Sequence, residues 1–260
     1  QNRSYVDFGL TAHAFPEDLG NLQALWEKGI MMFKIFTCNT HGIPTMNNDQ
    51  LYRAFEEIAS FNGSCLVHCE DDSITAGNEI RLKEANRIDN GIISEWRSET
   101  AEEIAVATVA LMARLTGVHA TIAHVSHPLV VDLIKREQQE GANLFGEICP
   151  QYLFLNEDIV KEKGPFAKFT PPARSTNQSR KMLDIFKEGA FQVLSTDHAP
   201  STIEQKLEGT IWDCNFGLPG VETTLPMMLN LVNENEITLE QVVQIYSETP
   251  AKLLGIYPQK

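Results

Sequence analysis

The chain has 260 residues, and its 35 Asp and Glu residues outnumber its 21 Lys and Arg residues. This acidic balance argues against nucleic acid as a partner, because affinity for nucleic acid depends largely on Lys and Arg. No window holds the ~18 uninterrupted apolar residues that a membrane span needs, so no membrane partner is expected. The length suits one large α/β domain.

The cysteines and the chain ends bear on cellular context. The five cysteines are scattered and contain no CxxC pair, which is typical of reduced thiols in a cytoplasmic protein. The first residue is Gln rather than Met, and the closing GIYPQK does not lead into a polar tail. We therefore expect a cytoplasmic protein and a piece of a longer chain.

Apolar runs of strand length recur along the chain and alternate with helical patterns. Six runs predict strands, at residues 5–10, 31–36, 64–68, 120–125, 143–147 and 191–195. After Asn48, apolar residues at helical spacing predict a helix that ends at Asn62 and Gly63. The expected buried face of this helix consists of Leu51, Ala54, Phe55 and Ile58.

Three further helices are expected. The capping-box pattern of Thr100 and Glu103 predicts the start of one, Pro128 opens another, and the box of Thr238 and Gln241 opens the last. The apolar faces expected for the first two consist of Ile104, Thr108, Leu111 and Leu115, and of Leu129, Leu133 and Ile134.

Strands that alternate with helices favour a parallel sheet with βαβ crossovers. An open doubly wound sheet would carry a glycine-rich phosphate turn after its first strand, and LTAHAFPEDLG offers none. A closed (β/α)8 barrel needs eight strands, so a barrel would lack two of them here. The segments 72–98 and 148–177 are too long for simple connectors, and we expect them to cover a functional site.

Four polar side chains fall at or near the ends of predicted strands, where a parallel barrel places its active site. These are Lys34, His68, His124 and Asp197. Each alone has an ordinary interpretation, because a single strand-end His is commonly structural and an Asp before a loop is commonly a cap. Together they form a nitrogen and oxygen set that suits Zn, Mn or Co. No Cys lies among them, which argues against a structural zinc.

Lys34 lies inside the apolar run MMFKIF and has three interpretations. It points outward or extends its ammonium to water; it forms a Schiff base; or burial lowers its pKa so that the neutral amine adds carbon dioxide. The resulting carbamate could bridge two metal ions. A Schiff base would leave the neighbouring histidines unexplained.

Several segments, taken together and in order, resemble one known family. They are FKIF, VHCED, AHVSHP, GEICPQYLFLNED, KFTPPAR, STDHAP followed by Lys206, GLPGVETTLPMML and PAKLLGIYPQK. The resemblance is to the cyclic-amide branch of the amidohydrolase superfamily, which includes hydantoinases, allantoinases, dihydropyrimidinases and dihydroorotases, and it runs through nearly the whole chain.

The resemblance implies a metal-dependent (β/α)8 barrel, of which residues 1–260 form a partial catalytic domain. It implies two divalent ions, zinc with manganese or cobalt as alternatives, bridged by a carbamylated Lys34. His68 and His124 would bind the second ion, and Asp197 would bind the first and move a proton. The family also has an HxH pair on its first barrel strand and a small β-sandwich, and both are absent from this sequence. The site of the chain as given is therefore expected to be incomplete.

The implied reaction is hydrolysis of a ring C–N bond by a hydroxide that bridges the two metal ions. Main-chain groups of Ile148, Cys149, Asn215 and Phe216 would hold the cyclic substrate. Asn39 stands where hydantoinases selective for the D-form and dihydropyrimidinases usually carry an oxyanion-stabilising tyrosine. The implied assembly is a homo-oligomer, commonly a tetramer.

Substrate expectations follow from departures from the family pattern. Dihydroorotases usually read NPP and DHAPH, whereas this chain has Thr170 and Ser201 at the corresponding positions. CPQYL and GIYPQK favour the hydantoinase and allantoinase side, so a hydantoin- or allantoin-type ureide is expected. The alternatives are a dihydroorotase or dihydropyrimidinase, and a non-catalytic dihydropyrimidinase-like scaffold. His198 is a candidate to support the ligands, whereas His13, His41, His119 and His127 are expected to be structural or superficial.

Overall fold

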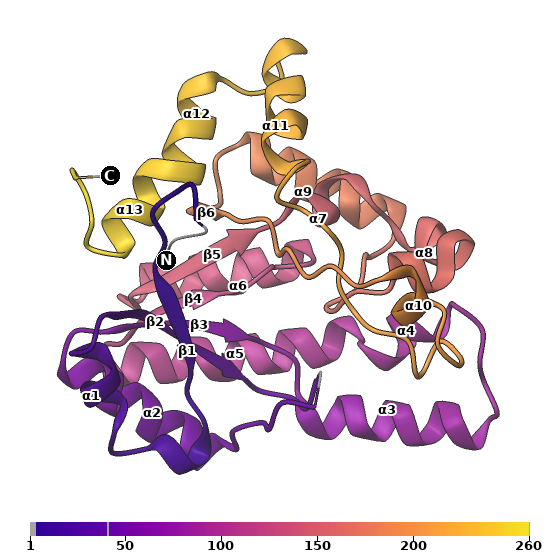
Figure 1. Ribbon diagram of the computed structural model, residues 1–260, viewed down its shortest axis with the longest axis horizontal. Helices are drawn as coiled ribbons and strands as arrows, with labels where there is room; N and C mark the ends of the chain where they lie inside the picture. The colour runs from indigo at the N-terminus through magenta and orange to yellow at the C-terminus, as the bar shows by residue number, and fades with distance from the viewer. Residues whose placement is uncertain (1–3, 41, 260) are drawn as a thin grey trace.

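The computed structural model describes residues 4–40 and 42–259, which form a curved, all-parallel sheet with helices arranged around its outside (Figure 1). The six strands described are β1 (Leu10–His13), β2 (Ile30–Phe36), β3 (Ser64–His68), β4 (His119–Ile122), β5 (Leu144–Ile148) and β6 (Val193–Leu194). Each strand pairs with its neighbour in the sequence. This order is that of a (β/α) barrel rather than of a doubly wound sheet, whose order reverses. The predicted α/β fold class is confirmed as a half-barrel.

The helices are as follows. They are α1 (Leu22–Trp26), α2 (Asn48–Ser60), α3 (Asp72–Glu84), α4 (Ile92–Trp96), α5 (Glu99–Thr116), α6 (Pro128–Gln139), α7 (Pro150–Phe154), α8 (Glu157–Lys163), α9 (Thr176–Lys187), α10 (Ile203–Lys206), α11 (Thr224–Asn233), α12 (Leu239–Val243) and α13 (Thr249–Leu253), with the 3-10 turns η1 (Pro16–Asp18) and η2 (Gly164–Ala167) and the π-helix η3 (Gln244–Glu248). No helix among the described residues is long and apolar enough to cross a bilayer.

Helix α2 forms as its sequence predicts. The Asn47 side chain accepts a hydrogen bond from the Gln50 main-chain N–H, and the Gln50 side chain accepts one from the Asn47 N–H. This reciprocal pair satisfies two N–H groups that the helix itself cannot satisfy. The buried residues of α2 are the predicted Leu51, Ala54, Phe55 and Ile58. The predicted box at Thr238 and Gln241 likewise caps α12.

The first predicted strand is wrong. The sheet begins at Leu10, where β1 pairs with Ile30 of β2, and not at residue 5. Tyr5, Val6 and Phe8 precede it and are exposed. An apolar run becomes a strand only where a neighbour supplies backbone hydrogen bonds, and β2 supplies them from Leu10 onward. The correction moves His13 to the end of β1, in register with Lys34.

The predicted face of α5 is wrong, and that of α6 is wrong only at Leu129. Ser98, not Thr100, caps α5, with its hydroxyl accepting from the Ala101 N–H. The expected apolar face of α5 points outward, and Leu115 is 62% exposed. In α6, Leu129 is exposed while Ile134 is buried as expected. The side of α5 that faces the core is built from small residues, namely Ala101, Ala105, Val106, Val109, Ala110 and Ala113.

The small residues of α5 explain that error, because they let the helix approach its neighbours closely while the larger side chains remain outside. A helix that is apolar on two sides does not reveal from its sequence which side is buried.

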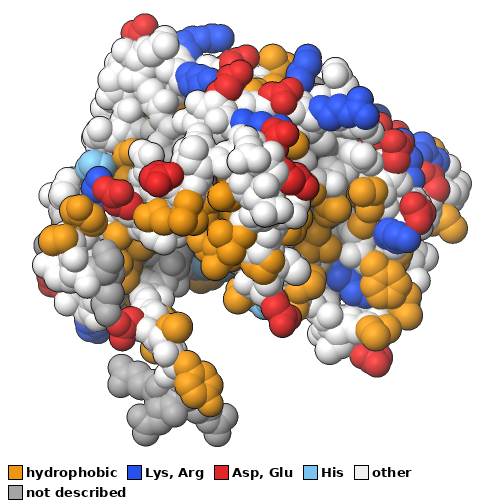
Figure 2. Space-filling model, turned by 90° about the horizontal axis from the view of Figure 1, so that it is seen from above, with side chains coloured by type: hydrophobic (Ala, Val, Ile, Leu, Met, Phe, Trp, Pro, Cys, Tyr) orange, Lys and Arg blue, Asp and Glu red, His pale blue; other side chains and the backbone are white. Residues whose placement is uncertain are grey.

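Hydrophobic side chains gather across the middle of the molecular face drawn in Figure 2, between groups of charged side chains.

The two long segments, which we expected to cover a functional site, are largely helical. Residues 72–98 contain α3 and α4, and residues 148–177 contain α7, α8 and η2. On the other side of the sheet from its helices, a cavity of about 590 Å³ is lined by Thr11, Met32, Leu66, Thr121, Glu147 and Leu254. Met32 and Leu66 lie two residues before Lys34 and His68, so the latter pair face the same interior.

Candidate metal centre

His68 and His124 form the centre of the candidate site. His68 ends β3, and His124 follows β4 by two residues. Nδ1 of His68 lies 3.0 Å from Nε2 of His124, and both side chains are buried. Burial lowers the pKa of each imidazole, and for His124 the neighbouring His68 lowers it further. The pair is therefore neutral at physiological pH, the form in which imidazole binds metals.

Two of the predicted ligands have an uncommon backbone conformation. His124 has φ of 40° and Asp197 has φ of 45°, in the left-handed region that residues other than glycine seldom adopt. The main-chain N–H of His124 donates to Glu147 Oε1 at 3.0 Å, which helps to hold the bend. Such conformations cluster at functional sites, where surrounding contacts compensate for their cost.

Lys34 is half-buried in β2, between the fully buried Phe33 and Ile35. Burial lowers the pKa of its ammonium, while the negative charges of Glu147 and Asp197 act in the opposite direction. Its Nζ lies 5.1 Å from the centre of the Phe36 ring. Lys34 thus faces the interior beside two carboxylates, and its amine is easier to deprotonate than that of a surface lysine.

Asp197 follows β6 by three residues and accepts a hydrogen bond from Gln151 Nε2 at 3.0 Å. Burial, and then the nearby Glu147, raise its pKa to about 7. Burial also raises the pKa of Glu147 itself. Two carboxyl groups that disfavour each other's ionisation lie next to Lys34, so a positive charge between them would be stabilised.

The donor set fits a divalent metal ion. Two nitrogens bound to one ion at 2.0–2.1 Å in tetrahedral geometry lie about 3.3 Å apart, close to the separation of His68 Nδ1 and His124 Nε2. Nδ1 of His124 is buried and has no hydrogen-bond partner among residues 4–40 and 42–259. Imidazole, carboxylate and amine-derived ligands suit zinc, manganese or cobalt.

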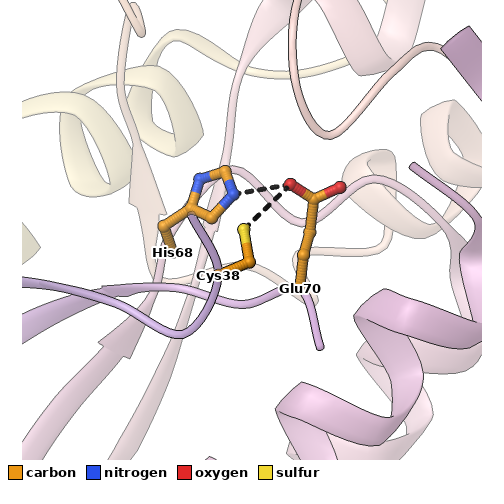
Figure 3. Close-up of side chains that lie close together, drawn as sticks. All are labelled: Cys38, His68 and Glu70. Atoms are coloured by element: carbon orange, nitrogen blue, oxygen red, sulfur yellow. Dashed lines mark hydrogen bonds and ion pairs between the residues drawn. The ribbon is translucent and has the colours of Figure 1, made fainter. Parts of the chain in front are cut away.

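Glu70 orients His68 and was not singled out from the sequence. Its fully buried carboxylate accepts from His68 Nε2 at 2.7 Å, from Thr170 Oγ1 at 2.8 Å and from Arg97 Nη1 at 3.4 Å. Figure 3 shows one carboxylate oxygen shared by the His68 ring and the Cys38 thiol. Donation from Nε2–H leaves the Nδ1 lone pair of His68 directed at His124. The available signal was an acid two residues after a strand-ending His, in VHCED.

Cys38, His68 and Glu70 also lie close enough to hold an ion, but their chemistry disfavours one. Burial, followed by the negative charge of Glu70, raises the pKa of the Cys38 thiol far above its ordinary value. Although burial alone would raise the pKa of Glu70, Arg97, His68 and Thr170 hold it down to about 2. The guanidinium of Arg97 already neutralises this carboxylate, so the group is a buried polar network.

Replacing Glu70 with Gln is expected to weaken zinc binding about 10- to 100-fold, the usual effect of losing a carboxylate that orients a ligand histidine. Competition against a chromophoric chelator on the metal-stripped protein measures the affinity. Glu84→Gln, at an exposed position, is the matched control. Equal zinc affinity in the Glu70→Gln variant and the wild type would contradict the orienting role.

The predicted substrate-contacting residues are distributed over three segments. Ile148 ends β5 and Cys149 follows it, both buried, with the Cys149 thiol 3.3 Å from Ser195 Oγ. Asn39 is exposed, and its carbonyl accepts from Arg97 Nη2 at 3.1 Å. Asn215 is exposed and Phe216 is half-buried. Their substrate contacts stay predictions.

Two buried lysines hold the loop that contains Asn215 and Phe216. Nζ of Lys206 donates to the carbonyls of Lys168, Asn215 and Gly217 at 3.2, 2.9 and 2.7 Å. Nζ of Lys168 donates to the Cys214 carbonyl at 2.6 Å and lies 4.2 Å from the Phe216 ring centre. Burial lowers the pKa of Lys168 to about 8. The loop is therefore fixed by cations that bind backbone oxygens.

Replacing Lys206 with Met is expected to destabilise the protein by about 2–3 kcal/mol, because three backbone carbonyls, two of them buried, lose a charged donor. The midpoint of urea unfolding measures this change. The control is Lys252→Met, which removes an exposed lysine paired with Glu248 and is expected to cost less than about 1 kcal/mol. Similar losses in both variants would show that the buried contacts of Lys206 add no stability.

Two further histidines have contacts of their own. His198 is exposed, and its Nδ1 accepts from the N–H groups of Gly220 and Val221 at 3.0 and 3.2 Å, so it holds a neighbouring loop. His13 packs edge-on against Phe36, and burial followed by the charge of Lys34 lowers its pKa. The expectation for His41 lies outside the described residues.

Comparison with known proteins defines the family. The sequence profile of the Amidohydrolase family matches residues 20–260, and the chain belongs to this family. It is 32% identical over 263 residues to an L-hydantoinase of Paenarthrobacter aurescens, covering 99% of this chain and 57% of that protein. It is 30% identical over 253 residues to a dihydroorotase of Pediococcus pentosaceus, covering 95% of this chain and 56% of that protein.

The fold agrees with solved structures. The L-hydantoinase (dihydropyrimidinase) from Arthrobacter aurescens superimposes with a TM-score of 0.92 at 31% identity, covering 98% of this chain and 58% of that structure. A D-hydantoinase from Bacillus sp. AR9 superimposes with a TM-score of 0.90 at 24% identity, which supports the fold alone. The chain thus spans less than two thirds of the length of these relatives. The predicted resemblance to the cyclic-amide branch is confirmed.

Proposed function

We propose that the protein containing this chain is a metal-dependent hydrolase that opens the ring C–N bond of a cyclic amide, with a hydantoin- or allantoin-type ureide as its substrate. The observation that carries the proposal is the pair of neutral, buried imidazoles, His68 and His124, whose facing nitrogens lie 3.0 Å apart beside Lys34 and Asp197. Residues 1–260 would form a partial catalytic domain.

His68, His124, Asp197 and a carbamylated Lys34 would hold two divalent ions, for which zinc is our choice and manganese or cobalt the alternatives. When bound, such ions lower the pKa of a coordinated water and polarise a carbonyl group. Burial of Lys34 favours the neutral amine, which adds carbon dioxide and releases a proton. The carbamate replaces a buried positive charge with a negative one that can bind cations.

Asp197 would move the proton during hydrolysis, taking it from the nucleophile and delivering it to the leaving amide nitrogen. Gln151 binds Oδ2 of Asp197 and fixes the carboxylate. Main-chain groups of Ile148, Cys149, Asn215 and Phe216, with Asn39 at the edge of the site, would hold the ring. The loop with Asn215 is ordered by Lys206 before any substrate arrives, which lowers the entropic cost of binding.

A hydantoin-type substrate is favoured over dihydroorotate by the position of Thr170. Its hydroxyl donates to buried Glu70, and the residue is buried, so it does not offer this group to a substrate carboxylate. Dihydroorotate remains the alternative substrate, since a dihydroorotase is among the relatives. A non-catalytic scaffold is the other alternative, and the presence of Lys34, His68, His124 and Asp197 together argues against it.

The test is the metal content of protein expressed from the complete reading frame in the presence of bicarbonate. About two ions per chain would support the binuclear site and lead to assays with hydantoin, allantoin, dihydrouracil and dihydroorotate. Protein without metal and without turnover of these compounds would favour the scaffold. We expect a cytoplasmic homo-oligomer, consistent with five buried, unpaired cysteines, and sedimentation would measure its size.

A further inference from the structure

His127, at the start of α6, is fully buried, yet neither of its ring nitrogens has a hydrogen-bond partner among the residues that the structure describes. Buried polar atoms are nearly always paired, so two unpaired nitrogens on one ring need an explanation. His127 belongs to AHVSHP but has no part in the site described above.

The carboxylates of α5 surround this ring. Nε2 of His127 lies 4.0 Å from Glu103 Oε1 and 3.8 Å from Glu102 Oε2. Glu102 is already occupied, because it accepts hydrogen bonds from Arg174 and Ser126. Glu103 and Glu99 are four residues apart and therefore lie on one face of the helix. One donor atom each from Glu99, Glu103 and His127 lie within 4.8 Å of one another.

We propose that Glu99, Glu103 and His127 bind a divalent transition-metal ion, separate from the candidate centre at His68 and His124. One imidazole and two carboxylates suit zinc or manganese better than magnesium, which prefers oxygen ligands alone. Oε2 of Glu99 accepts a hydrogen bond from Gln178 Nε2 at 2.7 Å, which leaves the other oxygen of this carboxylate for an ion. Glu103 is half-buried, and rotation of its side chain can shorten the 4.0 Å separation from His127 to the ~3.3 Å of two ligands on one ion.

The surroundings favour a cation and give it access. Within residues 4–40 and 42–259, neither Glu99 nor Glu103 has a lysine or arginine at ion-pair distance, whereas the charge of Arg174 is matched by Glu102. Glu99 also lines an open cavity of about 780 Å³ together with Pro128, which follows His127. Lys181 lines the same cavity but forms no ion pair with either glutamate among the described residues. Acidic residues near the start of a helix are favourable in themselves. That effect leaves the buried, unpaired ring of His127 unexplained.

The ion would link the first two turns of α5, which carry Glu99 and Glu103, to His127, the N-cap of α6. Because these ligands are distinct from Lys34, His68, His124 and Asp197, binding here does not depend on the proposed hydrolase activity. The test measures how much zinc the metal-stripped protein binds, for the wild type and for Glu103→Gln. Equilibrium dialysis sets the free zinc concentration, and atomic absorption measures the bound zinc. Glu140→Gln, at the exposed residue that follows the far end of α6, is the control.

We expect Glu103→Gln to bind one zinc ion fewer than the wild type, or to bind that ion at least about 10-fold more weakly, while Glu140→Gln matches the wild type. Subtraction isolates this ion regardless of how many bind elsewhere. Glu103 is half-buried, so its replacement should leave the protein folded, and circular dichroism checks this. Anomalous diffraction from zinc-soaked crystals should place a peak among Glu99, Glu103 and His127. Equal zinc content in both variants, or no peak there, would overturn the proposal.

Discussion

Replacing Lys34 with Ala is expected to lower turnover by at least about 10³-fold, equivalent to about 4 kcal/mol of transition-state stabilisation. The substitution removes the amine that would form the carbamate, and with it the only proposed ligand shared by both ions. Metal content should fall along with kcat.

The control for this prediction is Lys28→Ala at an exposed position, which should leave turnover and metal content unchanged. A short carboxylic acid such as propionate should partly restore activity to Lys34→Ala, because its carboxylate can stand in for the carbamate. A Schiff base predicts instead that borohydride inactivates the wild type in the presence of substrate. Unchanged metal content and rate in Lys34→Ala would refute the carbamate.

Replacing Arg174 with Met is expected to destabilise the protein by about 3–5 kcal/mol, because it leaves the carboxylate of Glu102 buried without its counter-charge. Arg174 donates to Glu102 at 2.8 Å, to Ser126 Oγ at 2.8 Å and to the carbonyl of Arg97 at 2.7 Å. These bonds tie the segment before α9 to α5 and to the loops after β4 and α4. Chemical denaturation measures the free energy of unfolding.

A surface pair provides the comparison. Arg114 donates to Glu137 at the same 2.8 Å distance but is partly exposed, so Arg114→Met should cost less than about 1 kcal/mol. The double variant Arg174→Met, Glu102→Leu should recover part of the loss, since it removes the uncompensated charge. If Arg174→Met costs no more than Arg114→Met, the buried network does not contribute to stability in this way.

Sequence periodicity identified most strands because each is a short apolar run bounded by polar turns. It failed at β1, where the apolar side chains of Tyr5, Val6 and Phe8 precede the point at which β2 supplies a partner. It also failed for the buried face of α5, because Ala and Val approach the sheet while Leu111 and Leu115 stay outside. Which of two apolar faces is buried depends on tertiary packing, which local sequence does not encode.

The strand-end rule placed Lys34, His68, His124 and Asp197 in one region, because carboxyl ends of parallel strands meet at one edge of a barrel. The residues that support these four side chains were harder to predict from the sequence. Glu70 acts through contacts with Arg97 and Thr170, the latter 100 residues away. Its place two residues after a strand-ending His is the one local signal, and that signal does not reveal which distant groups bind the acid in a chain with 35 Asp and Glu residues.

Lys206 has a further consequence for how this protein would respond to salt. Its ammonium, held by three backbone carbonyls, occupies the kind of oxygen cage in which other proteins bind a potassium or sodium ion. A tethered cation cannot dissociate, so the order of the 206–217 loop should not depend on the concentration of monovalent salt. Substrate affinity should accordingly vary little between sodium, potassium and choline buffers of equal ionic strength.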